Sequence, residues 1–197
     1  LLSRDATKWR AETRAAFAAV SLGRPIVLMG SGELGRRTAA GLRHDGIEPL
    51  AFADNSPEKQ GTQVAGLRVL SPADAAREFG TSAAFVVTIW GAGSAHRMEH
   101  SVAQLAALGC DVVIPFSVLY WAHAETLLPH YLQAEPHHVL EQADQVRRAF
   151  ELWEDEASRE VYVANVRFRV EGDFDCLPHP VDHPQYFPGD LYSWTPN

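Results

Sequence analysis

Residues 26–37, IVLMGSGELGRR, contain the transition that decides the fold. The continuous apolar run that opens this stretch is typical of a strand buried on both faces of a sheet. It ends at Gly30, and Gly32 and Gly35 follow at offsets of two and five residues. The pattern predicts a buried strand, a tight turn and the start of a helix.

Each glycine has a physical use in such a turn. Gly30 allows the sharp exit from the strand, Gly32 lets the backbone approach a phosphate closely, and Gly35 lets the helix pack tightly on the strand. The free N–H groups at the helix start favour an anion. We therefore predict a phosphate-binding loop. Its expected binding residues are Gly30, Ser31, Gly32, Glu33, Leu34 and Gly35.

Strand and helix signals alternate from residue 25 to residue 116. Strands or short extended pieces are predicted at 25–29, 46–54, 66–70, 83–90 and 110–116. Helices are predicted at 33–43, 72–79 and 97–108, the second with Ser71 as N-cap. This alternation predicts an α/β fold with a doubly wound parallel sheet of the Rossmann-like type.

The remainder of the chain has a different character. A leading helix is predicted over 4–20. After residue 116 the pattern is helical, and an apolar face over Leu140, Val146, Phe150 and Trp153 predicts one long helix. Alternating apolar residues over 161–170 leave a strand open there as an alternative. The many prolines from residue 178 onward predict an extended arm.

These signals divide the chain into four parts. They are a leading helix (1–24), a Rossmann-like nucleotide-binding domain (25–132), a helical linking segment (133–175) and a proline-rich arm (176–197). The chain opens on Leu1 and closes on a loop-like stretch, so we expect it to be part of a longer protein.

An acid follows the second predicted strand, about 20 residues beyond the glycine loop, where dinucleotide-binding proteins place the group that contacts ribose. This acid is Asp54, and Asn55 follows it. The carboxylate would accept hydrogen bonds from ribose or sugar hydroxyls and would repel a 2′-phosphate, which favours NAD over NADP. The alternative is that Asp54 and Asn55 only form a good turn.

A second glycine-rich stretch, TIWGAGSAH at residues 88–96, follows another apolar strand. If that strand lies beside the first one, the two glycine-rich turns flank one crevice at the point where strand order reverses. The expected binding residues there are Trp90, Gly91, Gly93 and Ser94. An ordinary strand-to-helix connection is the alternative.

Composition excludes several function classes. The formal net charge is −8 and only two residues are lysines, so we expect no binding to nucleic acid and none to a membrane surface. Two cysteines give no disulfide framework, and a reducing cytoplasm is the expected location. The histidines lack the spacing of a metal site, and no catalytic constellation such as Tyr-x-x-x-Lys or Gly-x-Ser-x-Gly is present.

Three ordered segments together resemble a known family. Residues 30–72 are similar to the opening domain that precedes the catalytic domain in many FkbM-family methyltransferases, and 152–174 to their linking helical segment. QYFPGDLYSW, residues 185–194, resembles the lead-in to their methyltransferase domain. The first segment is shared more loosely with nucleotide-sugar-binding domains of bacterial sugar acetyltransferases.

The resemblance implies methyl transfer from S-adenosylmethionine to a hydroxyl, carried out by a following methyltransferase domain that this sequence does not contain. We expect the present chain to bind a small nucleotide ligand, either a nucleotide, NAD(P) or a nucleotide-sugar, without catalysing a reaction alone. The alternatives are an NAD-dependent oxidoreductase fragment and a structural or dimerisation module, and a homo-oligomer stays open.

Overall fold

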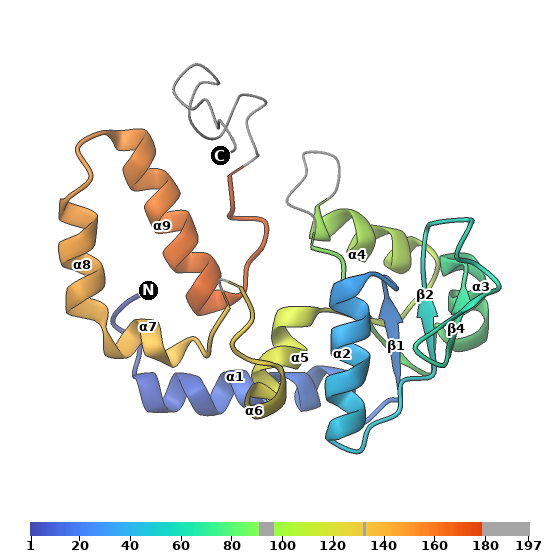
Figure 1. The fold of residues 1–197 in the computed structure, drawn as a ribbon. Coiled ribbons are helices and arrows are strands. Elements are labelled where there is room, and N and C mark those ends of the chain that lie inside the picture. Colours follow the sequence, from blue (N-terminus) through green and yellow to red (C-terminus); the bar gives the residue numbers. More distant parts are fainter. Residues whose placement is uncertain (91–96, 132, 179–197) are drawn as a thin grey trace, which may run out of the picture.

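The computed structural model describes residues 1–90, 97–131 and 133–178 (Figure 1). Within these residues, six strands form one sheet in the order β3-β4-β2-β1-β5-β6. The strands are β1 (Ile26–Met29), β2 (Ala51–Ala53), β3 (Gln63–Val64), β4 (Leu67–Leu70), β5 (Ala84–Val87) and β6 (Val112–Pro115). All neighbouring pairs are parallel except β3 with β4, so the predicted α/β, Rossmann-like fold is confirmed.

The strand order reverses between β1 and β5. Val27 pairs with Ala51 of β2 on one side and with Phe85 of β5 on the other. The predicted strand over 83–90 therefore does lie beside the first strand. Both strands are fully buried, which agrees with their continuous apolar sequences.

Helices connect the parallel strands. They are α2 (Glu33–His44) between β1 and β2, α3 (Pro72–Phe79) between β4 and β5, and α4 (Met98–Ala107) between β5 and β6. The connections through α2 and α4 run in opposite directions along the sheet, so right-handed crossovers place these two helices on opposite faces. In α3, Ser71 is the N-cap and accepts a hydrogen bond from the Asp74 N–H, as predicted.

Two details of the sheet differ from the predicted pattern. The predicted strand over 46–54 is only three residues long, because Gly46 (φ 79°) still belongs to the turn that ends α2 and Pro49 has no N–H to donate. The short strand β3 was not predicted. It forms an antiparallel hairpin with β4 around Ala65 and Gly66, whose positive φ values of 50° and 78° suit a tight hairpin turn.

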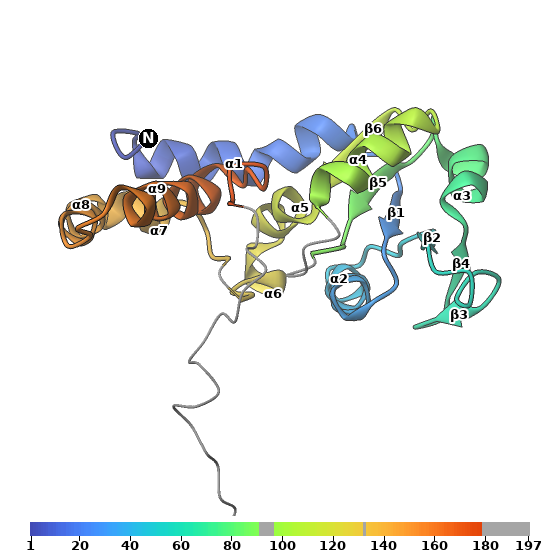
Figure 2. The same cartoon turned by 90° about the horizontal axis from the view of Figure 1, so that it is seen from above.

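The other helices lie to one side of the sheet (Figures 1 and 2). They are α1 (Ala6–Ser21), α5 (Phe116–Ala122), α6 (Ala124–Leu127), α7 (His137–Glu141), α8 (Ala143–Glu151) and α9 (Glu156–Glu171). The long helix α1 contacts both the sheet and the other helices. Phe17, near its end, packs in the main core, and Trp9, near its start, packs in a second small core with Leu140 and Val170.

The helical segment corrects two expectations. The predicted long helix over 140–153 is two helices, because Gln142 (φ −102°, ψ 21°) leaves helical geometry between α7 and α8. Residues 161–170 are helix and the strand alternative is wrong. Asp155 caps α9 at its start and Gly172 (φ 68°) ends it, and Tyr162, Val166 and Val170 face the second core at four-residue steps.

No helix among the described residues is long and apolar enough to cross a membrane. Most of the predicted extended arm, residues 179–197, lies outside the described part of the chain.

The first turn of α2 rests directly on the end of β1, and this contact generates a stability prediction. A Cβ added at Gly35 would lie 1.9 Å from the Gly30 carbonyl oxygen, whereas a Cβ at Gly32 would meet nothing within 4 Å. We expect Gly35→Ala to lower the free energy of unfolding by about 3 kcal/mol, and Gly32→Ala to change it by less than about 1 kcal/mol. Urea denaturation of both variants measures this, and equal midpoints would show that the close contact is not needed.

Candidate functional site

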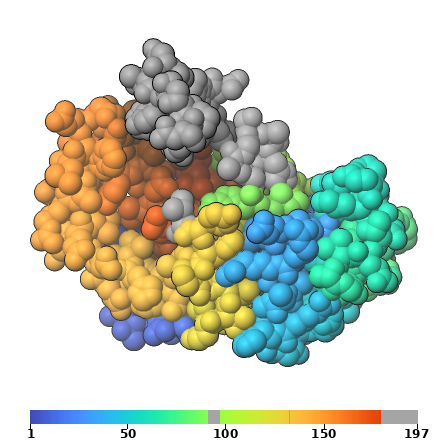
Figure 3. All heavy atoms as spheres, viewed as in Figure 1, coloured from blue at the N-terminus to red at the C-terminus, as the bar shows by residue number. Residues whose placement is uncertain are grey.

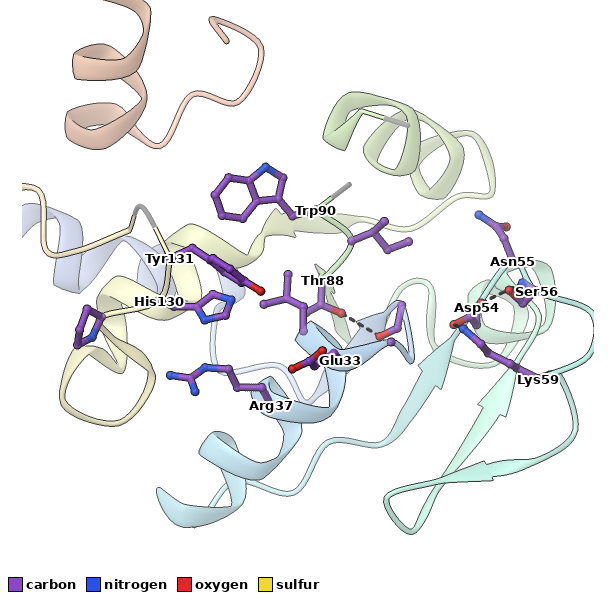
Figure 4. Close-up of a pocket in the computed structure, with 15 residues that line it drawn as sticks. Glu33, Arg37, Asp54, Asn55, Ser56, Lys59, Thr88, Trp90, His130 and Tyr131 are labelled. Atoms are coloured by element: carbon purple, nitrogen blue, oxygen red, sulfur yellow. Dashed lines mark hydrogen bonds and ion pairs between the residues drawn. The ribbon is translucent and has the colours of Figure 1, made fainter. Parts of the chain in front are cut away.

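A cavity of about 800 Å³ opens at the carboxyl ends of β1 and β5, where the strand order reverses. Ligands in open α/β sheets bind at this place because the loops on the two sides of the reversal diverge and leave a crevice. Four parts of the chain line the cavity: the glycine loop with the first turn of α2, residues 54–59 after β2, residues 88–90 after β5, and the loop 129–131 (Figure 4).

The glycine loop presents bare backbone to this cavity. Gly30 has φ 108°, a conformation that side chains rarely adopt, and a Cβ there would lie 2.6 Å from the Ile89 side chain. Gly32 is the N-cap of α2 and has no side chain to accept hydrogen bonds from the first N–H groups of the helix. These N–H groups and the positive end of the helix dipole are suited to an anion such as phosphate.

Asp54 ties the end of β2 to the glycine loop. Its Oδ2 accepts hydrogen bonds from the Ser31 N–H at 2.8 Å and the Ser31 hydroxyl at 2.5 Å, and its Oδ1 accepts one from the Ser56 N–H at 2.9 Å. The Lys59 Nζ lies 3.4 Å from Oδ2. The Asp54 side chain is only 9% exposed, so its first role in this structure is to hold the loop in place.

These contacts keep Asp54 ionised. Burial by itself raises the pKa of Asp54, but the hydrogen bonds from the Ser31 hydroxyl and from the Ser56 and Ser31 N–H groups, with the Lys59 ammonium, lower it to about 2. A carboxylate has about four acceptor positions, and Oδ1 accepts only the Ser56 N–H among the described hydrogen bonds. One acceptor position on Oδ1 is therefore not used by these hydrogen bonds.

Thr88, after β5, fixes the glycine loop from the side opposite to Asp54. Its hydroxyl donates to the Met29 and Gly30 carbonyl oxygens at 2.9 and 3.0 Å, and its N–H donates to the Met29 carbonyl at 2.8 Å. Thr88 and Asp54 hold the glycine loop from the two neighbouring strands. Such a fixed loop keeps its N–H groups oriented without a ligand, which reduces the entropic cost of binding.

An aromatic wall closes the far side of the cavity. It consists of Trp90, His130 and Tyr131, and Arg37 lies next to His130 (Figure 4). Trp90 and Tyr131 meet at 87° with ring centres 6.4 Å apart, and His130 and Tyr131 meet at 71° with centres 4.7 Å apart. Burial lowers the pKa of His130 and the Arg37 charge lowers it further, so the imidazole is neutral at pH 7.

Close packing of α2 on α6 positions the part of this wall that follows α6, His130 and Tyr131. A Cβ at Gly41 would come within 2.3 Å of the Leu127 side chain, so a larger residue there would force this buried side chain to shift. Asp45, just after α2, accepts hydrogen bonds from Thr126 at 2.6 Å and binds His123 Nδ1 at 2.6 Å. Figure 3 shows the blue surface of α2 directly against the yellow surface of the segment around α6.

The structure brings most of the predicted binding residues to one place. Those that line the cavity are Gly30, Gly32, Glu33, Leu34, Asp54, Asn55 and Trp90. Ser31 and Gly35 do not line it, because Ser31 is buried against Asp54 and Gly35 is buried on the end of β1. Gly91, Gly93 and Ser94 lie outside the described residues. The ligand contacts of all these residues stay predictions.

Sequence reasoning missed Lys59, Thr88, His130 and Tyr131 as lining residues. Thr88 carried a signal, because it is a polar residue at the end of an apolar strand. His130 and Tyr131 carried none, since they lie about 100 residues from the glycine loop in a segment with no local motif.

The described residues contain one group with metal-ligand side chains, and it lies away from the cavity. Glu135, His137 and His138 place one ligand atom each within 4.8 Å of one another. The Glu135 carboxylate is held by Arg14, with Nε–Oε1 2.7 Å, and by Arg10, with Nε–Oε1 3.3 Å. Because two guanidinium groups already neutralise this carboxylate, the group is a poor cation site.

The low pKa of Asp54 predicts a pH-dependent loss of stability. The unfolded carboxyl has the ordinary pKa of 3.8 and the folded one about 2, so the stabilisation is fully present above pH 5 and is lost as the pH falls toward 2. Its size is about 2–3 kcal/mol. We expect Asp54→Asn to remove this dependence on pH and to lower the free energy of unfolding at pH 7. Urea unfolding at pH 7 and at pH 3 measures both effects. Asp111→Asn, at a half-exposed acid in a single ion pair, serves as control. If the free energy of unfolding falls by the same amount between pH 7 and pH 3 in wild type and in Asp54→Asn, the pH dependence does not come from Asp54.

Comparisons with known proteins show the fold. The chain matches no protein-family model and no curated protein. A solved structure of methyltransferase FkbM from Methylobacillus flagellatus KT aligns with 93% of this chain at a TM-score of 0.67 and 17% identity. The alignment covers 49% of that protein, so the chain spans about half its length. UDP-D-quinovosamine 4-dehydrogenase from Vibrio fischeri aligns with 47% of this chain and 78% of its own, at a TM-score of 0.39 and 23% identity.

Proposed function

We propose that this chain is a nucleotide-binding domain whose glycine loop holds the phosphates of the ligand. The cavity at the carboxyl ends of β1 and β5 carries the proposal, because it joins an uncapped helix N-terminus to polar side chains on both sides. Lys59 on one side and Arg37 on the other supply positive charge. Asp54 supplies an acceptor for hydroxyl groups of the nucleoside, whereas the Asn55 amide is paired with Gln104 and lies beside it at the cavity edge.

The domain would serve a larger enzyme of the FkbM methyltransferase type. The structural alignment with such a protein across 93% of this chain supports this proposal, as does the resemblance of residues 30–72 and 152–174 to the family. In that arrangement a following domain would bind S-adenosylmethionine and transfer the methyl group. The glycine loop here would not bind it, since Leu28 stands where methyltransferases usually carry an acid.

A charge substitution at the N-cap of α2 tests the phosphate site. Aspartate and asparagine have nearly the same shape and both are good N-cap residues, so Gly32→Asp and Gly32→Asn should fold with unimpaired stability. The aspartate places a negative charge where the phosphate would bind. We expect Gly32→Asp to bind a nucleoside diphosphate at least about tenfold more weakly than Gly32→Asn, which corresponds to about 1.4 kcal/mol.

Isothermal titration with ADP, UDP and GDP measures this difference, and S-adenosylmethionine serves as the compound expected not to bind. If the wild-type chain binds none of the diphosphates, the proposed function is wrong. Equal affinities in the Asp and Asn variants would place the phosphates elsewhere.

A further inference from the structure

The two ends of the cavity differ in chemistry (Figure 4). Asp54, Asn55 and Lys59 form one end, and the N-terminus of α2 lies between the ends. The other end is the aromatic wall of Trp90, His130 and Tyr131. A ligand with its phosphates on α2 and its nucleoside toward Asp54 would extend the group on its distal phosphate toward the aromatic wall.

The aromatic wall also carries hydrogen-bonding groups of both kinds. Glu33, in the first turn of α2, offers a carboxylate acceptor, and Arg37, one turn further, offers guanidinium donors. His130 is neutral, so its ring has one donor and one acceptor nitrogen. Apolar ring surface thus lies beside donors and acceptors within one concave corner.

Tyr131 has an unusual backbone conformation and an exposed side chain. Its φ is 47°, a conformation uncommon for residues other than glycine, and its side chain is 83% exposed. A pair of backbone hydrogen bonds between His130 and Gln133, at 2.9 and 3.1 Å, fixes the turn on which it stands. The fold therefore presents an aromatic ring at the cavity rim rather than packing it in the core.

From these observations we infer that the aromatic end takes a sugar ring, so that the ligand is a nucleoside-diphosphate sugar. This inference rests on the proposed function. A sugar ring has a C–H face that packs on Tyr131 and Trp90, and hydroxyls that donate to Glu33 and accept from Arg37. In NAD the distal phosphate carries a ribose first and the nicotinamide ring beyond it, so a flat ring and a carboxamide would occupy the aromatic end. A hexose attached directly to the phosphate offers more hydroxyls to Glu33, Arg37 and His130.

Substitutions at Tyr131 test the sugar subsite separately from the phosphate site. We expect wild type to bind UDP-glucose, ADP-glucose or GDP-mannose about tenfold more tightly than the matching diphosphate. Tyr131→Ala should remove that gain and leave the affinity for the diphosphate within about twofold, whereas Tyr131→Phe keeps the ring and should keep most of the gain. Trp153→Ala, at an exposed aromatic residue outside the cavity, should change neither affinity.

Each outcome of this titration is informative. If neither diphosphates nor diphosphate sugars bind, the proposed function fails and the sugar subsite with it. If diphosphates bind but the sugar adds no affinity, or if the gain survives in Tyr131→Ala, the sugar subsite is wrong and the phosphate site stands. A Tyr131-dependent gain for NAD over ADP that exceeds the gain for every sugar would assign the aromatic end to nicotinamide instead.

Discussion

The close approach between Gly35 and the Gly30 carbonyl is the constraint on which the site depends. With no Cβ at residue 35, the first turn of α2 lies directly against the end of β1 and beside the Phe52 ring. This contact sets the direction of the helix axis relative to the sheet. The same contact brings the N-terminus of α2, with its free N–H groups, to the place where the strand order reverses.

Asp54 shows how one acid can serve both the fold and a ligand. In the pattern that defines dinucleotide-binding proteins, an acid at this position contacts ribose. Here three of its hydrogen bonds go to Ser31 and Ser56, and they hold the glycine loop against β2. These partners offset the cost of burying the charged carboxylate. They lower its pKa to about 2, so the group stays ionised. These bonds leave one acceptor position on Oδ1 unused, so a hydroxyl that reached it would add to the internal bonds without replacing them.

Trp90 connects the candidate site to the helical part of the chain. It packs on Phe116 at the start of α5 and on Phe168 of α9, with ring centres 5.8 Å apart in both pairs, and on Phe174 at 5.9 Å. Phe174 belongs to the segment that leaves α9, and Arg97 donates hydrogen bonds to the Leu177 and Asp175 carbonyls in the same segment. The wall of the cavity and the path of the chain after α9 are therefore parts of one packed cluster.

The sequence alone was sufficient to predict the five parallel strands of the sheet, the helices that connect them and the glycine loop, but not the edge strand β3. These features depend on local signals: apolar runs for β1 and β5, glycine spacing for the turn, and a Ser-Pro start for α3. The helical segment was harder to predict, since the alternating valines of α9 fit a strand equally well. Packing on Leu140 and Trp9 decided in favour of the helix.

Only the tertiary structure decided what surrounds the glycine loop. It showed that Asp54 bonds to Ser31, that Thr88 holds the loop from the other strand, and that Tyr131 reaches the cavity from a segment about 100 residues away. Sequence patterns cannot contain this information, because each contact joins segments that only the packed fold brings together. The pairing of β1 with β2 and β5 brings Asp54 and Thr88 to the loop, and the packing of α6 near Gly41 of α2 places the segment that carries Tyr131. The sequence by itself therefore determined that a glycine loop joins β1 to α2, and long-range packing decided the shape and chemistry of the cavity around it.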